Sequence, residues 1–511
     1  MTNDLVSLAL EALRRKDFAA ARKAMREFAD EHPLEFQHYL ILGLSELALQ
    51  DYFSARDVFE EASQVFPHQA QVWFNLGVAL ENTGALDEAA ASYEKSLTIH
   101  SEQADACGNL SNIYRKRGRF HDAEMMAHRA FELGAPKAQA LNLLGLALAC
   151  QGKFEAAEST YRQALTHDPN CAQALANLAS LSVDKLDFSS AWPLFESARK
   201  INDAPEIRLV EGLSRLLAGD AAQGWPLQEA RLEISGALRM RPTCPMWKGE
   251  SLHGKRLLVL AEQGFGDVIQ FCRYGRLLSE IGAELIWVVP RPLVRFLAAN
   301  LSGRVQGEDE PLPDAELWLP IMSLPLATGK LDFSDAPAAP YLRAPEAPLL
   351  PRKGGNSVRH IGLVWTASPT HQRDHERSIS LNALAALWGI KGSRYYAPFV
   401  NPRIDEQLRS QPIIRLDKVI SDFADTAALL WQLDGLVAVD TAAAHLAGAL
   451  GVRTWLLLPY CPDWRWGTLG TTTPWYPSVT LYRQKAAGDW DDVIEGLTQD
   501  IAAYCAQALP L

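Results

Sequence analysis

Apolar and small residues recur with a fixed period over roughly residues 3 to 203. Pro33 and Pro67 lie 34 residues apart, and Pro169 lies 102 residues after Pro67, which is three times that spacing. Inside each period, apolar residues return every three or four positions, as in Ala157-Tyr161-Ala164, and this spacing predicts amphipathic helices. The pattern therefore predicts repeated pairs of helices, with small residues where two helices touch closely.

The period and its phase resemble those of the tetratricopeptide repeat (TPR). The first helix of successive repeats is marked by Tyr39-Leu42-Gly43, Trp73-Leu76-Gly77, Leu110-Tyr114 and Leu144-Gly145, and the second by Ala55-Phe59-Ala62, Ala89-Tyr93, Ala123-Ala130, Ala157-Tyr161-Ala164 and Ala191-Phe195-Ala198. Residues 206–233 read as a degenerate last repeat, so we predict an α-superhelical array of about six to seven repeats over residues 1–235. The resemblance implies a concave face that binds protein segments and does no chemistry itself.

Asparagines recur in phase on the predicted first helices. Asn75 and Asn109 lie 34 residues apart, and Asn177 lies 68 residues after Asn109. The intervening in-phase position is Leu143, and the nearest amide, Asn142, stands one residue early. A ladder of amides can hold an extended peptide backbone, so Asn75, Asn109 and Asn177 are candidates for binding a protein acceptor. Ordinary polarity of a helix surface is the alternative interpretation.

Residues 236–252 are irregular and predict a hinge. After this segment, short apolar runs alternate with amphipathic segments. This alternation predicts an α/β region of two Rossmann-like lobes, residues 253–340 and 359–511, joined by a Pro/Ala/Gly-rich linker over residues 341–358. The first lobe is short for its type. The predicted strands are near 256–261, 284–289, 316–319, 360–368 and 413–415, and residues 436–458 add a strand, a helix and another strand. The other predicted helices are near 267–282, 291–300, 381–389, 402–409 and 424–432, with a terminal helix that has Asp489 as its N-cap.

Candidate catalytic and ligand-binding residues follow the ends of two predicted strands. In the first, Gly264 and Gly266 precede a helix that begins near Asp267, and glycines with positive φ would let the backbone approach a phosphate. In the second, Asp440-Thr441 precedes a helix of small residues that carries His445. The structural alternatives are that Asp267 is an N-cap beside a tight turn and that His445 is a helix histidine packed among alanines.

The segments EQGFGD, RHIGLVWTAS, RSIS, SDFADTAALL, VDTAAAHLAGALG, DWRWG and WYP resemble the C-terminal region of bacterial TPR-linked glycosyltransferases related to the heptosyltransferase family. Those enzymes have the GT-B fold, and relatives with an array include flagellin glycosyltransferases. The resemblance implies that Asp267 is the general base. It also implies donor binding by Gly264, Gly266, Arg377, Asp440, Thr441 and His445. Ala442 departs from the family, which usually has glycine after the Asp-Thr pair.

The resemblance implies metal-independent, inverting transfer of a sugar from a nucleotide-activated donor to Ser or Thr of a protein acceptor, with flagellin favoured and no cofactor. The one D-x-D sequence, Asp489-Trp490-Asp491, reads as a helix start and not as a metal site. Two alternatives stay open: a non-catalytic TPR adaptor, and a transferase acting on a lipid-linked saccharide. Nothing in the sequence separates ADP, UDP, GDP and CMP as the donor nucleotide.

The amino-acid composition limits which classes of partner and which cell compartment we expect. The net charge of −12 and the pI near 5.5 argue against nucleic-acid binding, which requires a basic face. The seven cysteines are scattered and form no CxxC pair, as expected in a reducing cytoplasm. No apolar run approaches the roughly 18 residues of a membrane-spanning helix. We therefore expect a cytoplasmic protein without a membrane span.

Overall fold

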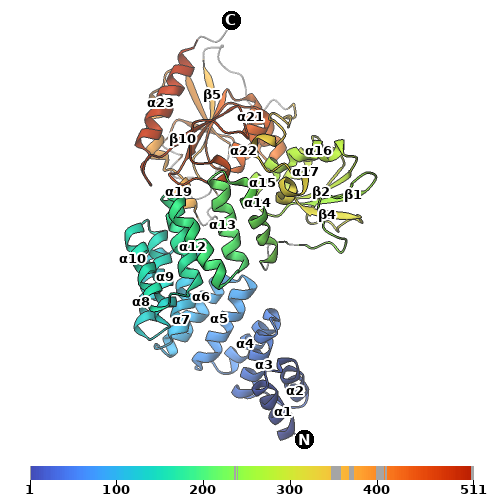
Figure 1. Cartoon of the computed structure of the whole chain (residues 1–511), viewed down its shortest axis with the longest axis vertical. Coiled ribbons are helices and arrows are strands. Elements are labelled where there is room, and N and C mark those ends of the chain that lie inside the picture. The colour runs from blue at the N-terminus through green and yellow to red at the C-terminus, as the bar shows by residue number, and fades with distance from the viewer. Residues whose placement is uncertain are drawn as a thin grey trace. The chain divides into compact units, whose positions relative to one another are not determined.

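The computed structural model describes residues 2–234, 238, 240–346, 358–367, 373–398, 408 and 411–507. These residues form two compact units (Figure 1). The first contains Met1–Leu181 and Ser190–Asn202, and the second contains Ser182–Ser189 and Asp203–Leu511. Most of the helix expected near residues 402–409 and most of the linker over residues 341–358 lie outside the described residues.

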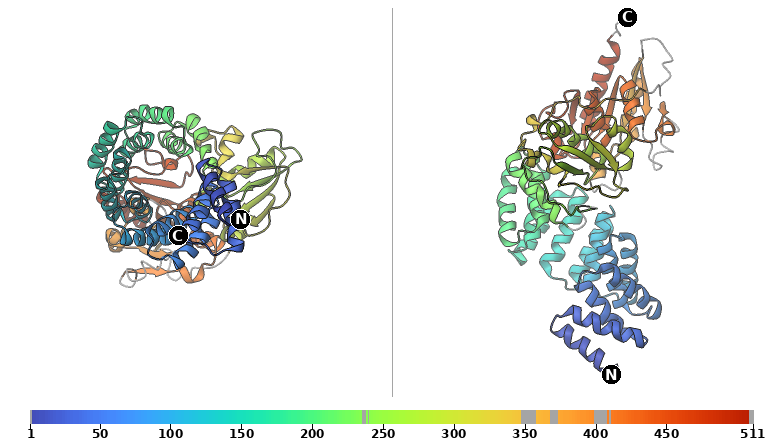
Figure 2. Two further views of the ribbon diagram at one scale, coloured as in Figure 1. Left: turned by 90° about the horizontal axis from the view of Figure 1, so that it is seen from below. Right: turned by 90° about the vertical axis from the view of Figure 1, so that its right-hand side faces the viewer.

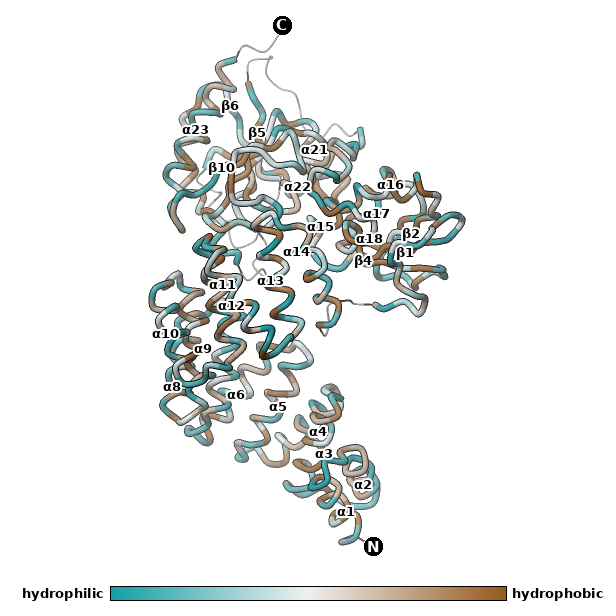
Figure 3. The backbone as a smooth tube through the Cα atoms, in the orientation of Figure 1, coloured by the Kyte–Doolittle hydropathy of each residue, from teal (hydrophilic) through white to brown (hydrophobic). Residues whose placement is uncertain are grey.

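The first unit consists of antiparallel helix pairs that wind around a central axis (Figure 2). Hydrophobic and hydrophilic stretches alternate along each helix, as the amphipathic pattern predicts (Figure 3). The paired helices predicted from the period are confirmed. They are α1 (Thr2–Arg14), α2 (Phe18–Glu31), α3 (Phe36–Ala48), α4 (Tyr52–Val65), α5 (Ala70–Thr83), α6 (Leu86–Ile99), α7 (Ala104–Lys116), α8 (Phe120–Glu132), α9 (Lys137–Cys150), α10 (Phe154–His167), α11 (Ala172–Asp184) and α12 (Phe188–Ile201).

Glycines on first helices let an aromatic ring of the second helix approach the backbone. A Cβ atom on Gly145 in α9 would lie 2.5 Å from Cε1 of Tyr161 in α10, which is closer than real Cβ contacts come. The same relation pairs Gly43 with Phe59 and Gly77 with Tyr93. Each ring is fully buried, so it has no room to move. The small residues predicted at the contact points therefore set the distance between paired helices.

We predict that Gly145→Ala destabilises the chain, because the added methyl group overlaps the Tyr161 ring; such overpacking costs about 1–3 kcal/mol. Gly108→Ala in α7 is the matched control. Its Cβ would meet only Leu143 Cδ1 at 3.5 Å, and alanine favours the helix by about 0.5–1 kcal/mol. Urea unfolding of both variants checks this, and equal midpoints would contradict the packing argument.

The second unit contains two parallel sheets. The first has the strand order β3-β2-β1-β4 and the second the order β10-β9-β8-β5-β6-β7. Numbered from its own first strand, the second order is 3-2-1-4-5-6 read from the other edge, which is the Rossmann order. The strands are β1 (Arg256–Leu260), β2 (Glu284–Val289), β3 (Arg304–Gly307), β4 (Leu317–Pro320), β5 (Arg359–Val364), β6 (Ser393–Ala397), β7 (Ile413–Arg415), β8 (Gly435–Val439), β9 (Thr454–Leu458) and β10 (Val479–Arg483).

The helices of the second unit depart from the sequence prediction in detail. The helix expected over residues 267–282 is broken into α15 (Phe265–Phe271), the 3-10 turn η2 (Cys272–Tyr274) and α16 (Gly275–Glu280), and Gly275 lies against the Trp287 ring. The segment expected as a helix near 381–389 is the 3-10 helix η5 (Leu381–Gly389). The others are α17 (Arg291–Ala298), α18 (Leu324–Thr328), α19 (Asp374–Arg377), α21 (Phe423–Gln432), α22 (Ala442–Leu450) and α23 (Asp491–Ala506), with the 3-10 turns η3 (Ile321–Ser323), η4 (Phe333–Asp335), η7 (Asp417–Val419) and η8 (Trp464–Trp466).

The segment expected to cap the array packs instead within the second unit. It forms α13 (Pro205–Leu217), α14 (Ala221–Gln228) and the 3-10 turn η1 (Glu229–Glu233). Trp225 is fully buried, donates from Nε1 to the carbonyl of Leu331 at 2.9 Å, and packs edge-on against Phe271 and Trp464. The continuous part of the second unit therefore begins at Asp203 and includes this helical hairpin.

We predict that a fragment beginning at residue 203 is markedly more stable than one beginning at residue 236. The shorter fragment loses Arg231, whose partner Glu262 has a side chain only 1% exposed. A buried charge left without its partner costs about 3–5 kcal/mol. Thermal unfolding of the two fragments checks this. Equal melting temperatures would show that the hairpin does not stabilise the sheets.

Candidate functional site

The candidate site lies where the carboxyl end of β1 and the carboxyl end of β8 lead into helices. The loop after β1 enters α15, and Asp440-Thr441 after β8 enters α22. These two helix starts touch: a Cβ atom on Gly266 would lie 2.9 Å from Cδ2 of His445 and 3.7 Å from Cα of Ala442. The structure thus brings the two strand–loop–helix segments that the sequence singled out to one place.

The expectation that Gly264 and Gly266 adopt positive φ is wrong. Gly264 is the N-cap residue of α15 with φ of −70° and ψ of 164°, and Gly266 is not among the glycines with positive φ. The reason for glycine at 266 is the close contact of α15 with α22, because any side chain there would meet the His445 ring. A Cβ atom on Gly264 would meet only Asp267 Oδ2, at 3.6 Å.

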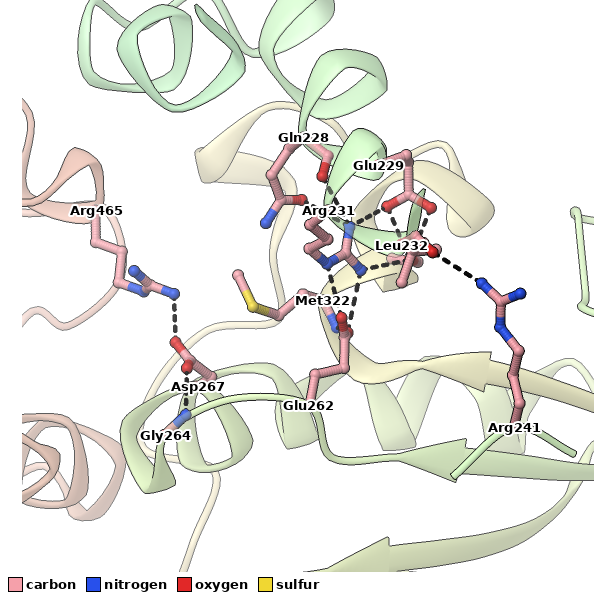
Figure 4. A network of polar contacts seen from close by, with 11 residues as sticks. Gln228, Glu229, Arg231, Leu232, Arg241, Glu262, Gly264, Asp267, Met322 and Arg465 are labelled. Carbon is pink, nitrogen blue, oxygen red and sulfur yellow. Dashed lines mark hydrogen bonds and ion pairs between the residues drawn. The ribbon is translucent and has the colours of Figure 1, made fainter. Parts of the chain in front are cut away.

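Asp267 is the third residue of α15, and both of its carboxylate oxygens are engaged. Oδ2 accepts a hydrogen bond from the backbone N–H of Gly264 at 2.9 Å. Oδ1 forms an ion pair with Nη2 of Arg465 in η8 (Figure 4). Burial raises the pKa of Asp267, and the Arg465 guanidinium opposes that rise. Asp267 is therefore not the N-cap residue, which is Gly264, but its carboxylate caps α15 from the third helical position, and it also links α15 to η8.

Arg465 joins η8 to α15. Its Nε donates to Oε1 of Gln270 at 2.6 Å, and its Nη1 donates to Oδ1 of Asp463 at 2.9 Å. The guanidinium also lies over the Trp464 ring, 4.3 Å from its centre. Burial acts to raise the pKa of Asp463, but the ion pair with Arg465 outweighs it and holds that pKa below its ordinary value. Sequence reasoning missed Asp463 and Arg465 as site residues, and their signal was the pair of charges inside the DWRWG segment.

His445 is buried in α22 and uncharged. Its Nδ1 hydrogen bonds with the hydroxyl of Tyr476 at 2.9 Å, and its ring stacks on Trp466. Burial, and then the charge of Arg465, lower the pKa of His445 to about 3. Its Nε2 lies 3.9 Å from Oδ1 of Asp440, beyond hydrogen-bond distance. The imidazole is therefore neutral at any working pH.

Asp440, directly after β8, has a carboxyl group whose pKa lies close to neutral pH. Burial, and then the negative charge of Asp463, raise the pKa of Asp440 to about 6, while Arg377 opposes the rise. Arg377 ends α19, and its Nε is buried with no hydrogen-bond partner among the described residues. Thr441 is the N-cap residue of α22, but its side chain does not cap the helix, because Oγ1 donates to the carbonyl of Val439 at 3.2 Å.

The three ladder asparagines belong to the first unit and differ from one another. Asn75 is 5% exposed and its Nδ2 has no hydrogen-bond partner among the described residues. Asn109 donates from Nδ2 to the hydroxyl of Tyr93 at 3.1 Å, and Asn177 donates to Oδ1 of Asn142 at 2.8 Å. Asn142, one residue out of phase in the sequence, is therefore brought beside Asn177.

Two further sequence features have structural roles. Trp464, Trp466 and Trp475 are all buried, and Trp464 packs against Phe271 in α15, the helix that follows the first strand of the other sheet. The D-x-D sequence begins the terminal helix. That helix starts at Asp491 with Trp490 at the N-cap, one residue later than expected, and Asp489 Oδ1 accepts the N–H of Asp491 at 3.0 Å.

Among the described residues, no group of three or more His, Cys, Asp or Glu side chains could hold a metal ion. Over the same part of the chain, no helix is both long and apolar enough to cross a bilayer. All seven cysteines are free thiols.

We predict that Gly266→Ala disrupts the contact between α15 and α22, because its methyl group would meet a His445 ring that is fixed by Tyr476 and Trp466. We expect a loss of stability of about 1–3 kcal/mol, as for other overpacked sites. Gly264→Ala is the control, since its added atom has space and its backbone suits any residue. Thermal unfolding distinguishes the two, and a Gly266→Ala variant as stable as the control would contradict the close packing.

Comparison with known proteins identifies the repeats. Family models described as tetratricopeptide repeat match residues 6–62, 44–104, 103–134 and 138–171. A TPR protein from Parabacteroides merdae ATCC 43184 is 13% identical, covering 45% of this chain and 92% of that chain with a TM-score of 0.42. A MamA fragment from Desulfovibrio magneticus RS-1 is 19% identical, covering 33% of this chain and 94% of that chain with a TM-score of 0.30.

One curated relative extends beyond the repeats. Protein FlbA of Caulobacter vibrioides (strain ATCC 19089 / CIP 103742 / CB 15) is 23% identical in an alignment of 403 residues that covers 67% of this chain. The match spans 63% of that relative's length. The array that the residue period predicted therefore consists of tetratricopeptide repeats, followed by a unit of two parallel sheets with helices.

Proposed function

We propose that the second unit is a glycosyltransferase of the GT-B type, which transfers a sugar from a nucleotide-activated donor to Ser or Thr of a protein bound by the TPR array. The observation that carries this proposal is the buried charged cluster at the meeting point of the two sheets. There Asp440 and Asp463 lie within reach of the Arg465 that pairs with Asp267. Such clusters of shifted carboxyl groups at strand ends are typical of active sites.

The donor end of the proposed site is the second sheet. Its strand order reverses between β5 and β8, and ligands of open α/β sheets bind outside the carboxyl ends of the strands at such a point. The start of α22 offers backbone N–H groups and a partial positive charge to a phosphate. Arg377 supports this assignment, because its buried Nε has no protein partner here and could donate to a phosphate oxygen. No metal is needed in this scheme.

The proposed reaction is a single displacement at the anomeric carbon. The acceptor hydroxyl forms the new bond, the bond to the nucleotide phosphate breaks so that the nucleotide leaves, and Asp267 takes the hydroxyl proton. Each Asp267 oxygen has a second lone pair beyond its present hydrogen bond, so the carboxylate can still accept a proton. The neutral His445 can hydrogen bond a sugar or phosphate oxygen without adding charge.

The proposed acceptor is a protein, because TPR arrays characteristically bind protein segments. Asn75 supports the predicted amide ladder, since its buried Nδ2 lacks a partner among the described residues. We propose flagellin as this acceptor on the family resemblance alone. The competing function is a non-catalytic adaptor, and it is favoured by the engagement of both Asp267 oxygens in a helix cap and an ion pair.

Nucleotide binding decides between these functions. We expect one of ADP, UDP, GDP and CMP to raise the melting temperature of the full chain, because a ligand at 100 times its Kd adds about 2.7 kcal/mol to stability. Asp440→Ala should lose that shift. Asp267→Asn should keep it but release nucleotide from the matching nucleotide sugar, with flagellin present, about 10² to 10⁴ times more slowly.

Asp463→Asn is the matched control, because it also removes a carboxylate from Arg465 but leaves Asp267 unchanged. A smaller loss in this variant supports Asp267 as the base. Equal losses would show that Asp267 acts only through the charge of Arg465. If none of the four nucleotides shifts the melting temperature, the adaptor function replaces the transferase.

A further inference from the structure

A buried arginine connects the helical hairpin to the loop that carries Asp267. Arg231 in η1 is 3% exposed and forms a two-pronged pair with Glu262: Nε to Oε2 at 2.7 Å and Nη2 to Oε1 at 3.1 Å (Figure 4). Its Nη1 donates to Oε1 of Glu229 at 2.6 Å, and Nη2 also donates to the hydroxyl of Ser323 at 2.8 Å. All three guanidinium nitrogens of Arg231 therefore donate hydrogen bonds to groups inside the protein.

Glu262 fixes the place where the first sheet would hold a ligand. It follows the end of β1 and begins the loop that leads to Asp267. Its Oε1 also accepts the backbone N–H of Met322, directly after β4. The strand order of this sheet reverses between β1 and β4, the position at which open sheets collect ligands. In this chain a protein cation, Arg231, holds that position.

The same hairpin also touches the other partner of Asp267. Helix α13 packs on η8, the turn that contains Arg465, and Trp225 of α14 packs edge-on against Trp464 at a ring distance of 5.2 Å. The hairpin over residues 205–233 therefore contacts both ends of the arrangement around Asp267. One contact is with the loop that carries the carboxylate, and the other is with the turn that carries its cation.

We propose that Arg231 is a positioning residue, which orders the loop from Glu262 to Asp267 and so sets the Asp267 carboxylate against Arg465. This inference rests on the proposed function for its consequence in catalysis, but the ordering of the loop is a property of the protein alone. The role differs from simple stabilisation. A buried ion pair is a poor source of stability compared with apolar residues of similar volume, so a structural role alone does not require this pair.

The test separates ordering from stability by exchanging the pair for apolar residues. Arg231→Met leaves Glu262 buried and unpaired, whereas Arg231→Met with Glu262→Met removes both buried charges of that pair. Glu229 then loses its cation but is 20% exposed and keeps the Ser323 hydroxyl, so the double variant should restore the melting temperature. Ser323→Ala is the control, because it removes the hydrogen bonds that the Ser323 hydroxyl makes with Arg231 and Glu229 and leaves the Glu262 pair intact. Arg231→Lys keeps the charge but loses the two-pronged geometry, and it provides the comparison if Arg231→Met does not fold.

Amide hydrogen exchange measures how well the loop from Glu262 to Asp267 is ordered, in the full chain and without any ligand. The N–H of Asp267 donates to the carbonyl of Gly264 at 3.1 Å, so its protection reports whether the loop is ordered. In the double variant we expect exchange at Gly264 and Asp267 to accelerate by about tenfold or more relative to amides of β8, at an unchanged melting temperature. Ser323→Ala should exchange like the wild type. Wild-type protection of the loop in the double variant would overturn the proposal.

Nucleotide release from the donor sugar tests the catalytic consequence separately. In the double variant we expect kcat to fall by about 10-fold or more while KM for the nucleotide sugar stays unchanged, because donor binding is assigned to the second sheet. An unchanged kcat with a disordered loop would overturn the link from the loop to catalysis. If the wild type releases no nucleotide, the proposed transferase fails, and hydrogen exchange still decides the positioning role of Arg231.

Discussion

The ion pair between Asp267 and Arg465 is the interaction on which the rest of the candidate site depends. Asp267 lies in α15, which follows a strand of the first sheet, and Arg465 lies in η8, which follows a strand of the second sheet. Their side chains are 13% and 8% exposed. Charges removed from water in this way are tolerated only when each has partners. Arg465 meets this requirement by also binding Asp463 and Gln270. Removing any one carboxylate from this cluster therefore changes the charge balance of the others, including the poised carboxyl group of Asp440.

The local parts of this arrangement were predictable from the sequence. A strand, a short loop and a helix start are each defined by neighbouring residues, so the segments around Asp267 and Asp440 were located correctly. The repeat array was predictable for the same reason, because every helix pair repeats one pattern of small and aromatic residues. Short strands such as β3, with the sequence RVQG and no apolar run, give no such signal and were missed.

The partners of the site residues were not predictable, because they are distant in the sequence. Arg465 lies 198 residues from Asp267, and only the folded chain shows that they pair. The role of Gly266 likewise depends on His445, a residue of the other sheet's helix. The hairpin over residues 205–233 shows a related effect. Its helices continue the periodic pattern of the array, but the contacts of Trp225 and Arg231 attach it to the unit that contains the sheets. Local periodicity predicts a helix and does not say which neighbour buries it.

The boundary at Asp203 has a consequence for how such chains change over evolution. Each repeat of a TPR array contacts mainly its neighbours, so a whole repeat can be gained or lost with little effect elsewhere. The hairpin that holds the Glu262 loop lies on the sheet side of the boundary and is untouched by such changes. The length of the array, and with it the size of the protein segment it can hold, is therefore free to vary while the charged cluster between the sheets stays the same.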